Sequence, residues 1–247
     1  MATLPNPLPR LAELGLRLPP GTLMDTLLWL ADGRTAPGEW AALRQRAPRV
    51  GLLPVVIDAG SGHGGPERWE LAPCEMSYPG DHDAEEVLEE FWDTYGDTDW
   101  PGLAEAPQGS GAEPETVAAD LVESLLDGTG GPLREPRLAL VPARRSADIP
   151  TAIGWTGPVN HENDTARLSA VLRSWEDRFG TRVVALGYDT LLVSVAAPPT
   201  TLAEAQVLAA EHYAFCPDNL DQGADPTLTA YAERRLLGRP AWHFWWD

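Results

Sequence analysis

The chain has 247 residues, 43% of them hydrophobic and 22% charged, which is ordinary for a globular protein. Its formal net charge of −19 disfavours binding to nucleic acid, because a phosphate backbone requires clustered Lys and Arg. No apolar run is long enough for a membrane helix, and the N-terminus lacks the basic start and apolar core of a signal peptide. The only cysteines, Cys74 and Cys216, give no disulfide framework, so we expect a cytoplasmic protein.

The first part of the chain predicts short elements of both kinds. Residues 1–22 are rich in proline and are expected to lie on the surface. Residues 23–31 form a short apolar element, for which a helix is favoured over a strand. A helix is predicted over residues 37–46, with proline at its first position. Residues 50–57 form a buried strand, in which Pro54 indicates a sheet edge or a bulge because proline lacks the ladder donor.

The middle of the chain continues this mixture up to Trp155. The helix over residues 83–95 carries apolar side chains on one side and a run of glutamates on the other. The other expected elements are a strand at 68–71 paired with the preceding strand, a loop or linker at 96–112, a helix at 114–126, a glycine-rich break at 128–131, a strand at 138–141 and a short helical piece at 146–155.

The stretch from Asp164 to Asp218 predicts the unit around which the other elements pack. Asp164 or Thr165 is a natural N-cap, and the following apolar residues form one helical stripe that ends at Gly180: Leu168, Val171, Leu172, Trp175 and Phe179. An antiparallel hairpin follows, with strands over 181–186 and 190–195. A second helix, capped by Thr200 or Thr201, is expected to reach about Phe215.

The C-terminal residues predict one more helix and a final strand. The helix covers residues 226–237, and the strand covers residues 240–247. Aromatic side chains alternate onto both sides of this strand, so we expect it to be buried in the sheet. The alternative is that these rings are exposed and stack on a ligand.

Several of these residues resemble a bacterial family of unknown function, number 4253. The resemblance depends on Glu211-x-Tyr213-x-x-Cys216-Pro217-Asp218 and on the terminal Trp242-x-Phe244-Trp245-Trp246-Asp247, together with Trp175, Asp189 and Pro198-Pro199. It covers roughly residues 138–247, and Trp40-x-x-Leu43 with Gly51-Leu-Leu-Pro54 is similar to the front part of longer members. The resemblance therefore implies a C-terminal domain over 137–247 and an N-terminal part over 1–136 packed with it as one unit. It implies no activity.

The segment around Cys216 is the strongest candidate for chemistry. His212 and Cys216 share a helical face at i, i+4, and an imidazolium could lower the pKa of the thiol and so activate a nucleophile. A cysteine at a helix end before proline is more often a small buried side chain, which is the favoured interpretation. The candidate pocket consists of Glu211, His212, Tyr213, Cys216, Asp218 and Trp245.

Two other patterns are weaker. Gly60-x-Gly62-x-x-Gly65 matches the dinucleotide fingerprint, but the residues after it predict a strand instead of the required helix, so a flexible hairpin loop is favoured. The clusters Asp81-His82-Asp83 and His161, Glu162 and Asp164 lack the spacing of metal ligands and are expected to be solvated loops. We therefore expect neither a metal nor another cofactor.

These patterns predict an α+β fold with a mostly antiparallel sheet flanked by helices. The acidic charge and the lack of a catalytic constellation favour a protein that is not an enzyme and that binds a basic protein partner. An immunity-type role, in which the partner is a basic toxin, is one concrete version. The alternative is a small-molecule or metal-dependent enzyme with its pocket around His212, Cys216 and Asp218. The sequence leaves the oligomeric state open.

Overall fold

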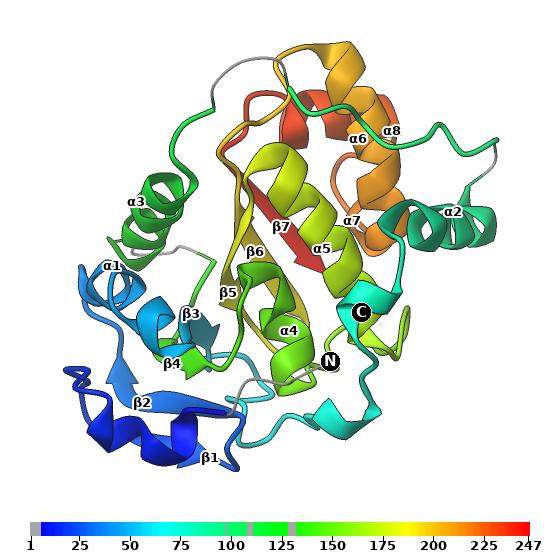
Figure 1. Ribbon diagram of the computed structural model, residues 1–247. Coiled ribbons are helices and arrows are strands. Elements are labelled where there is room, and N and C mark those ends of the chain that lie inside the picture. Colours follow the sequence, from blue (N-terminus) through cyan, green and yellow to red (C-terminus); the bar gives the residue numbers. More distant parts are fainter. Residues whose placement is uncertain (1–5, 97, 108–110, 128–131) are drawn as a thin grey trace.

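The computed structural model describes residues 6–96, 98–107, 111–127 and 132–247. These residues form a seven-stranded sheet in the order β1-β2-β4-β3-β5-β6-β7 (Figure 1). All neighbouring strands are antiparallel except β3 and β5. The strands are β1 Gly21–Met24, β2 Leu28–Arg34, β3 Leu53–Asp58, β4 Pro136–Val141, β5 Arg182–Leu186, β6 Thr190–Ser194 and β7 Ala241–Trp245. The predicted α+β class is confirmed.

Helices cover both faces of this sheet. The α-helices are α1 Glu39–Arg44, α2 Ala84–Tyr95, α3 Pro114–Asp127, α4 Ile149–Ile153, α5 Thr165–Phe179, α6 Leu202–Phe215, α7 Asp218–Asp221 and α8 Leu228–Tyr231. Short 3-10 segments are η1 Leu8–Glu13, η2 Ala47–Val50, η3 Pro73–Glu75, η4 Pro79–Asp81 and η5 Ser146–Asp148, and η6 Ala232–Leu236 is π-helical. No described helix has both the length and the apolar character needed to cross a bilayer.

The sheet separates two hydrophobic cores. Alternate residues of one strand enter opposite cores, as Val55 and Val56 of β3 show. The larger core contains α2, α5 and α6, and its centre is Trp175, whose ring stacks on Phe244 at 5.4 Å between centroids. The smaller core contains α1 and α3. β4 lies between β2 and β3 in the sheet although it follows both of them in the sequence, and β5 to β7 continue the same sheet. Strands from the N-terminal and the C-terminal part of the chain therefore form one sheet.

The unit from Asp164 to Asp218 forms as predicted, for local reasons. Asp164 accepts a hydrogen bond from the backbone N–H of Ala166 at the start of α5, and Gly180 ends the helix with φ +62°. β5 and β6 then form the antiparallel hairpin. α6 begins with a capping box, in which Thr201 and Glu204 each bond the other's backbone N–H.

Two of the elements predicted for the N-terminal part are wrong. Residues 23–31 form the turn and adjoining strands of the β1–β2 hairpin instead of a helix, with positive φ at Asp25 and Thr26. Four consecutive residues of β2 are buried because the strand is covered on both faces, so its sequence shows no alternation. Residues 68–71 form no strand, although Trp69 is buried.

Pro54 lies in an interior strand and not at a sheet edge. β3 pairs with β4 along its whole length, but its pairing with β5 begins only at Val56. The Pro54 carbonyl accepts a hydrogen bond from the indole of Trp40 at 3.2 Å. Since the N–H and C=O of one strand residue point to the same side, the donor that proline lacks would have faced this indole and not a ladder partner.

Most other elements are confirmed. These are α1, α2, α3, β4, the helical piece from Ser146, and α8 with η6. The described residues of the 96–112 stretch are irregular as expected, yet Ala104 is buried in the larger core. The expected break at 128–131 lies outside the described residues. β7 belongs to the sheet as predicted, and it is an edge strand that buries Trp242 and Phe244 on one face while His243 is exposed on the other.

Candidate functional site

Glu211 is a buried carboxylate with a complete set of partners. It lies on α6, a helix that is buried on nearly all sides, and its side chain is 0% exposed. It accepts hydrogen bonds from both terminal nitrogens of Arg178, at 2.8 and 2.6 Å, from the Trp175 indole at 2.7 Å and from the Ala104 backbone at 2.7 Å. Arg178 also donates to the Ala104 carbonyl. Glu211 and Arg178 therefore anchor the irregular 98–107 segment to α5 and α6.

His212 lies inside an aromatic box. Its ring is within 5 Å, between centroids, of Trp175, Trp242 and Phe244, and its Nδ1 lies 3.2 Å from the Tyr231 hydroxyl. Burial, with a smaller contribution from Arg178, lowers the pKa of this imidazole well below its usual value. His212 is therefore uncharged at neutral pH and cannot act as the imidazolium that would activate a thiol.

The Cys216 thiol is buried at the end of α6 and forms a hydrogen bond with the backbone. The residue is 0% exposed, and its thiol donates to the Trp245 carbonyl at 3.0 Å. Burial raises the pKa of this thiol far above its usual value. A protonated, enclosed thiol is a poor nucleophile.

The residues after Cys216 bind the same strand. Asn219 donates to the His243 carbonyl at 2.8 Å and accepts from the Trp245 backbone at 3.2 Å, and Asp218 accepts from the Asp247 backbone at 3.0 Å. The two stretches that carry the family resemblance are therefore hydrogen-bonded to each other. The side chains of Cys216 and Asn219 form hydrogen bonds with backbone groups of β7. Because β7 is an edge strand, these backbone groups would otherwise be free to pair with another chain.

The remaining candidate residues point elsewhere. The Tyr213 hydroxyl bonds the Tyr95 carbonyl and Asp221, next to α2. Trp245 is half-buried, and its indole donates to Asp189 at 3.3 Å in a separate hollow. The structure thus brings Cys216 and Asp218 together around β7, but Glu211 and His212 lie in the core behind it.

The histidines and acids of the two weaker clusters also contact other residues of the protein. His82 lies 2.6 Å from the Ser77 hydroxyl, His161 contacts Tyr95, and Glu162 pairs with Arg167. Among the residues that the structure describes, no three His, Cys, Asp or Glu side chains are grouped as a metal ion would require. No helix follows Gly60-x-Gly62-x-x-Gly65, so the loop does not form the dinucleotide motif, and no strand follows it either.

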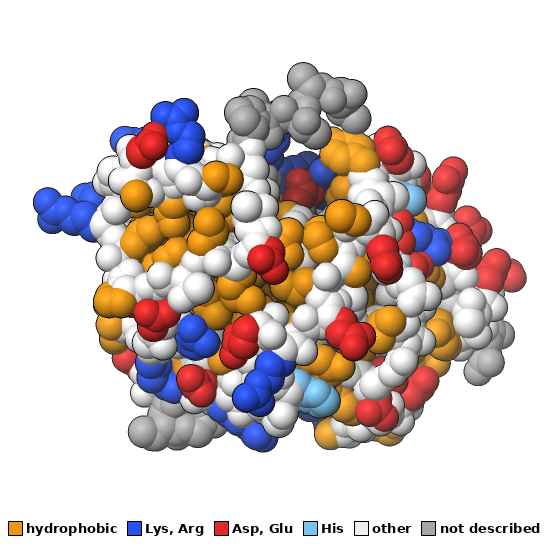
Figure 2. Space-filling model, turned by 90° about the horizontal axis from the view of Figure 1, so that it is seen from below, with side chains coloured by type: hydrophobic (Ala, Val, Ile, Leu, Met, Phe, Trp, Pro, Cys, Tyr) orange, Lys and Arg blue, Asp and Glu red, His pale blue; other side chains and the backbone are white. Residues whose placement is uncertain are grey.

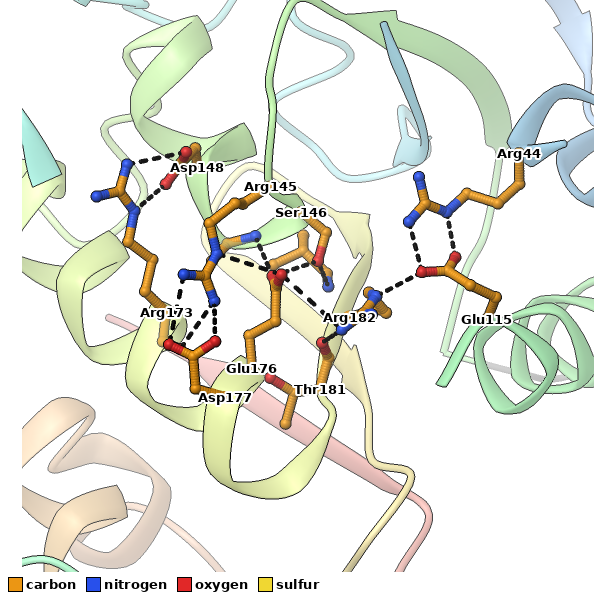
Figure 3. Close-up of polar contacts among 12 residues, drawn as sticks. Arg44, Glu115, Arg145, Ser146, Asp148, Arg173, Glu176, Asp177, Thr181 and Arg182 are labelled. Atoms are coloured by element: carbon orange, nitrogen blue, oxygen red, sulfur yellow. Dashed lines mark hydrogen bonds and ion pairs between the residues drawn. The ribbon is translucent and has the colours of Figure 1, made fainter. Parts of the chain in front are cut away.

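A chain of ion pairs joins the two parts of the molecule (Figure 3). Glu115 of α3 accepts from Arg44 of α1 and from Arg182 of β5. Burial by itself would raise the pKa of Glu115, but the hydrogen bonds and charges of these two arginines lower it overall. The chain continues through Glu176 to Arg145, which also pairs with Asp177. Its acids and bases balance, so it contributes little to the net charge.

The excess negative charge comes from one segment that sequence inspection missed. Residues 69–133 contain 17 of the 37 acidic residues and none of the 18 basic ones. A running count of charge along the chain would have identified it. On α2 this segment presents five exposed acids, of which only Glu90 has an ion-pair partner in the described chain: Glu85, Glu86, Glu89, Glu90 and Asp93. We call these five residues the α2 acidic face.

The α2 acidic face lies on one flank of the molecule. Figure 2 shows acidic side chains gathered on the right, the side on which α2 lies in Figure 1. The opposite face of α2 packs Val87, Leu88, Phe91 and Trp92 into the larger core. Asp218 and Asp221 are close enough to the end of α2 to raise the pKa of Tyr95, after the larger effect of burial. Acids of α7 therefore extend this negative region.

Comparison with known proteins bears on one part of the chain. No curated protein and no solved structure matches it. Residues 137–247, which begin in β4 and include α4 to α8 and β5 to β7, match a family model. As the resemblance predicted, that family is the one described as a domain of unknown function, DUF4253.

Proposed function

We propose that the protein is a non-enzymatic interaction module whose α2 acidic face binds a basic surface of another protein. The observation that carries this proposal is the concentration of acidic side chains on the exposed face of α2, where four of the five have no ion-pair partner in the described chain. Opposite fields on two proteins steer their encounter and raise the association rate. An immunity-type role against a basic toxin is one version, and the two free cysteines are consistent with a cytoplasmic location.

The α2 acidic face has a cost for the folded protein. Glu85 and Glu89, Glu86 and Glu90, and Glu89 and Asp93 are like-charged pairs at i, i+4, each of which destabilises a helix by about 0.2–0.5 kcal/mol. Asp93 also lies in the last turn, where the helix dipole favours a positive charge. Glu85 and Glu86 lie in the first turn, where the helix dipole favours a negative charge, and Glu90 pairs with Arg167, so the cost falls on Glu89 and Asp93. A binding role gives a reason for keeping these two charges.

The buried polar residues support the same proposal. Glu211 and Cys216 use their polar atoms to bond α5, the 98–107 segment and β7. With no ionised nucleophile at Cys216 and no imidazolium at His212, that segment is better explained by stability than by catalysis.

The test compares three forms of the protein as bait in a lysate of the source organism. The first is wild type, and the second carries E85Q/E86Q/E89Q/D93N on α2. The third is a charge-matched control with four exposed acids changed elsewhere, none of which has an ion-pair partner in the described chain: E75Q/D120N/D127N/E233Q. We expect wild type and control to retain one basic protein, and the α2 variant to lose it by about tenfold or more, which is roughly 1.4 kcal/mol.

Zero-length crosslinking then locates the contact. All 18 basic residues of the chain are arginine, so a carbodiimide cannot join two of its own side chains. It joins carboxylates of this protein to lysines of a partner, and we expect the crosslinked peptides to contain α2. Equal retention by the three baits, retention of no basic protein, or crosslinks confined to other acids would each contradict the proposal.

A further inference from the structure

A hollow of about 330 Å³ opens at the edge of the sheet where the parallel strands β3 and β5 end. The glycine-rich loop after β3 and the turn after β5 line it, together with the segment before β4 and the end of β7. Loops at the carboxyl ends of neighbouring parallel strands are a common place for ligand binding. The volume is within the range of small-molecule sites.

Two of its walls are aromatic. The rings of His63 and Tyr188 stack in parallel with 3.8 Å between centroids and 6° between planes. Trp245 lines another side, where its indole bonds Asp189 and so has a defined orientation. His243 lies beside it, and partial desolvation lowers the pKa of its imidazole, so that it is uncharged at neutral pH. Faces of this kind stack on a planar ring.

The lining of the hollow also includes one arginine, Arg134. Asp58 accepts backbone hydrogen bonds from Gly60, Arg134 and Glu135, so it holds together the two loops that line the hollow. The Arg134 side chain is exposed and has no ion pair or hydrogen bond within the described chain. A free guanidinium can bind a carboxylate or a phosphate through two parallel hydrogen bonds.

We propose that this hollow binds a small molecule that combines a planar aromatic ring with one anionic group, the ring between Tyr188 and Trp245 and the anion on Arg134. Asp189 accepts from donors on the ring. The proposal does not depend on the α2 acidic face, and it gives the glycine-rich loop a role as a wall of the site without the dinucleotide geometry.

The test uses the imidazole NMR signals of the five histidines. Adenosine monophosphate and indole-3-acetate are the charged probes, and adenosine and indole are their uncharged counterparts, each titrated to about 10 mM. We expect at least one charged probe to shift the signals of His63 and His243 and to leave the buried His212 unchanged. Its uncharged counterpart should bind at least about tenfold more weakly.

The variant R134Q should remove this preference for the charged probe. Residue 134 contacts Asp58 through its backbone N–H and not through its side chain, so the variant should fold normally. Circular dichroism checks this. R46Q removes another exposed arginine of the chain and should bind like wild type. The proposal is overturned if neither charged probe shifts His63 and His243, or if charged and uncharged probes bind equally, or if R134Q binds like R46Q.

Discussion

Replacement of Glu211 by glutamine tests whether this carboxylate has the structural role that its contacts indicate. The side chain is 0% exposed and accepts four hydrogen bonds, while Arg178 is 15% exposed. The glutamine amide keeps one of the two carboxylate oxygens and replaces the other with an NH₂ group. Each oxygen of Glu211 accepts two hydrogen bonds, so two donors then face the NH₂ group instead of an acceptor. At least two of the four hydrogen bonds are therefore lost, and Arg178 loses its counter-charge.

The expected loss of stability follows from this geometry. Breaking a buried ion pair by removing one partner costs about 3–5 kcal/mol. Because water reaches part of Arg178, we expect the lower end, about 3 kcal/mol in the free energy of unfolding. For a chain of this size that corresponds to a fall in Tm of roughly 6–12 °C.

Urea unfolding followed by circular dichroism measures the effect, and E115Q is the matched control. Glu115 also accepts from two arginines, but it is 34% exposed, so we expect a loss of about 1 kcal/mol or less. Exchange of the Ala104 amide and of the Trp175 indole N–H gives a second readout, because one of these two donors loses its acceptor in E211Q and neither does in E115Q. A double-mutant cycle with R178M separates the pair from its surroundings. If E211Q were no less stable than E115Q, and exchange at both Ala104 and the Trp175 indole were unchanged, the reasoning would be refuted.

Three further outcomes are expected. A thiol reagent should label the exposed Cys74 in the native protein and leave Cys216 unmodified until the chain unfolds, as mass spectrometry would show. The free energy of unfolding should fall as the pH drops below about 6.5, by up to about 1.4 kcal/mol per pH unit for one histidine. The reason is that the pKa of His212 is lowered in the folded protein, so the unfolded chain binds a proton that the folded chain does not. The variant H212Q should weaken this pH dependence. Residues 137–247 expressed alone should not unfold cooperatively, because β4 would lose both of its neighbours, β2 and β3.

Each of these expectations has a clear contrary result. Labelling of both cysteines at equal rates would show that Cys216 is accessible. The same pH dependence in wild type and H212Q would assign the effect to other groups. A sharp, two-state transition of the 137–247 fragment would show that the C-terminal part forms its core without the front strands.

The sequence predicted the elements whose signals are local. The helices α2, α5 and α6 combine an N-cap with an apolar pattern or a stop, and these features act within a few residues of the chain. Prediction was wrong where burial on both faces removed the alternation of β2. It was also wrong where Pro54 indicated an edge or a bulge, although β3 pairs with β4 in a continuous register and an indole from α1 lies beside Pro54. Those cases depend on neighbours that are distant in the sequence.

For the candidate site, the sequence by itself determined that Glu211, His212, Cys216 and Asp218 fall close together at the end of a predicted helix, and it favoured a buried Cys216. Only the tertiary structure decided that the partners of Glu211 and Cys216 are Arg178, Ala104 and the backbone of β7 instead of a substrate. It also placed His63, Arg134, Tyr188 and Trp245 around one hollow. The physical reason is that hydrogen-bonding capacity and charge belong to single residues, whereas burial and the identity of a partner depend on how distant segments pack.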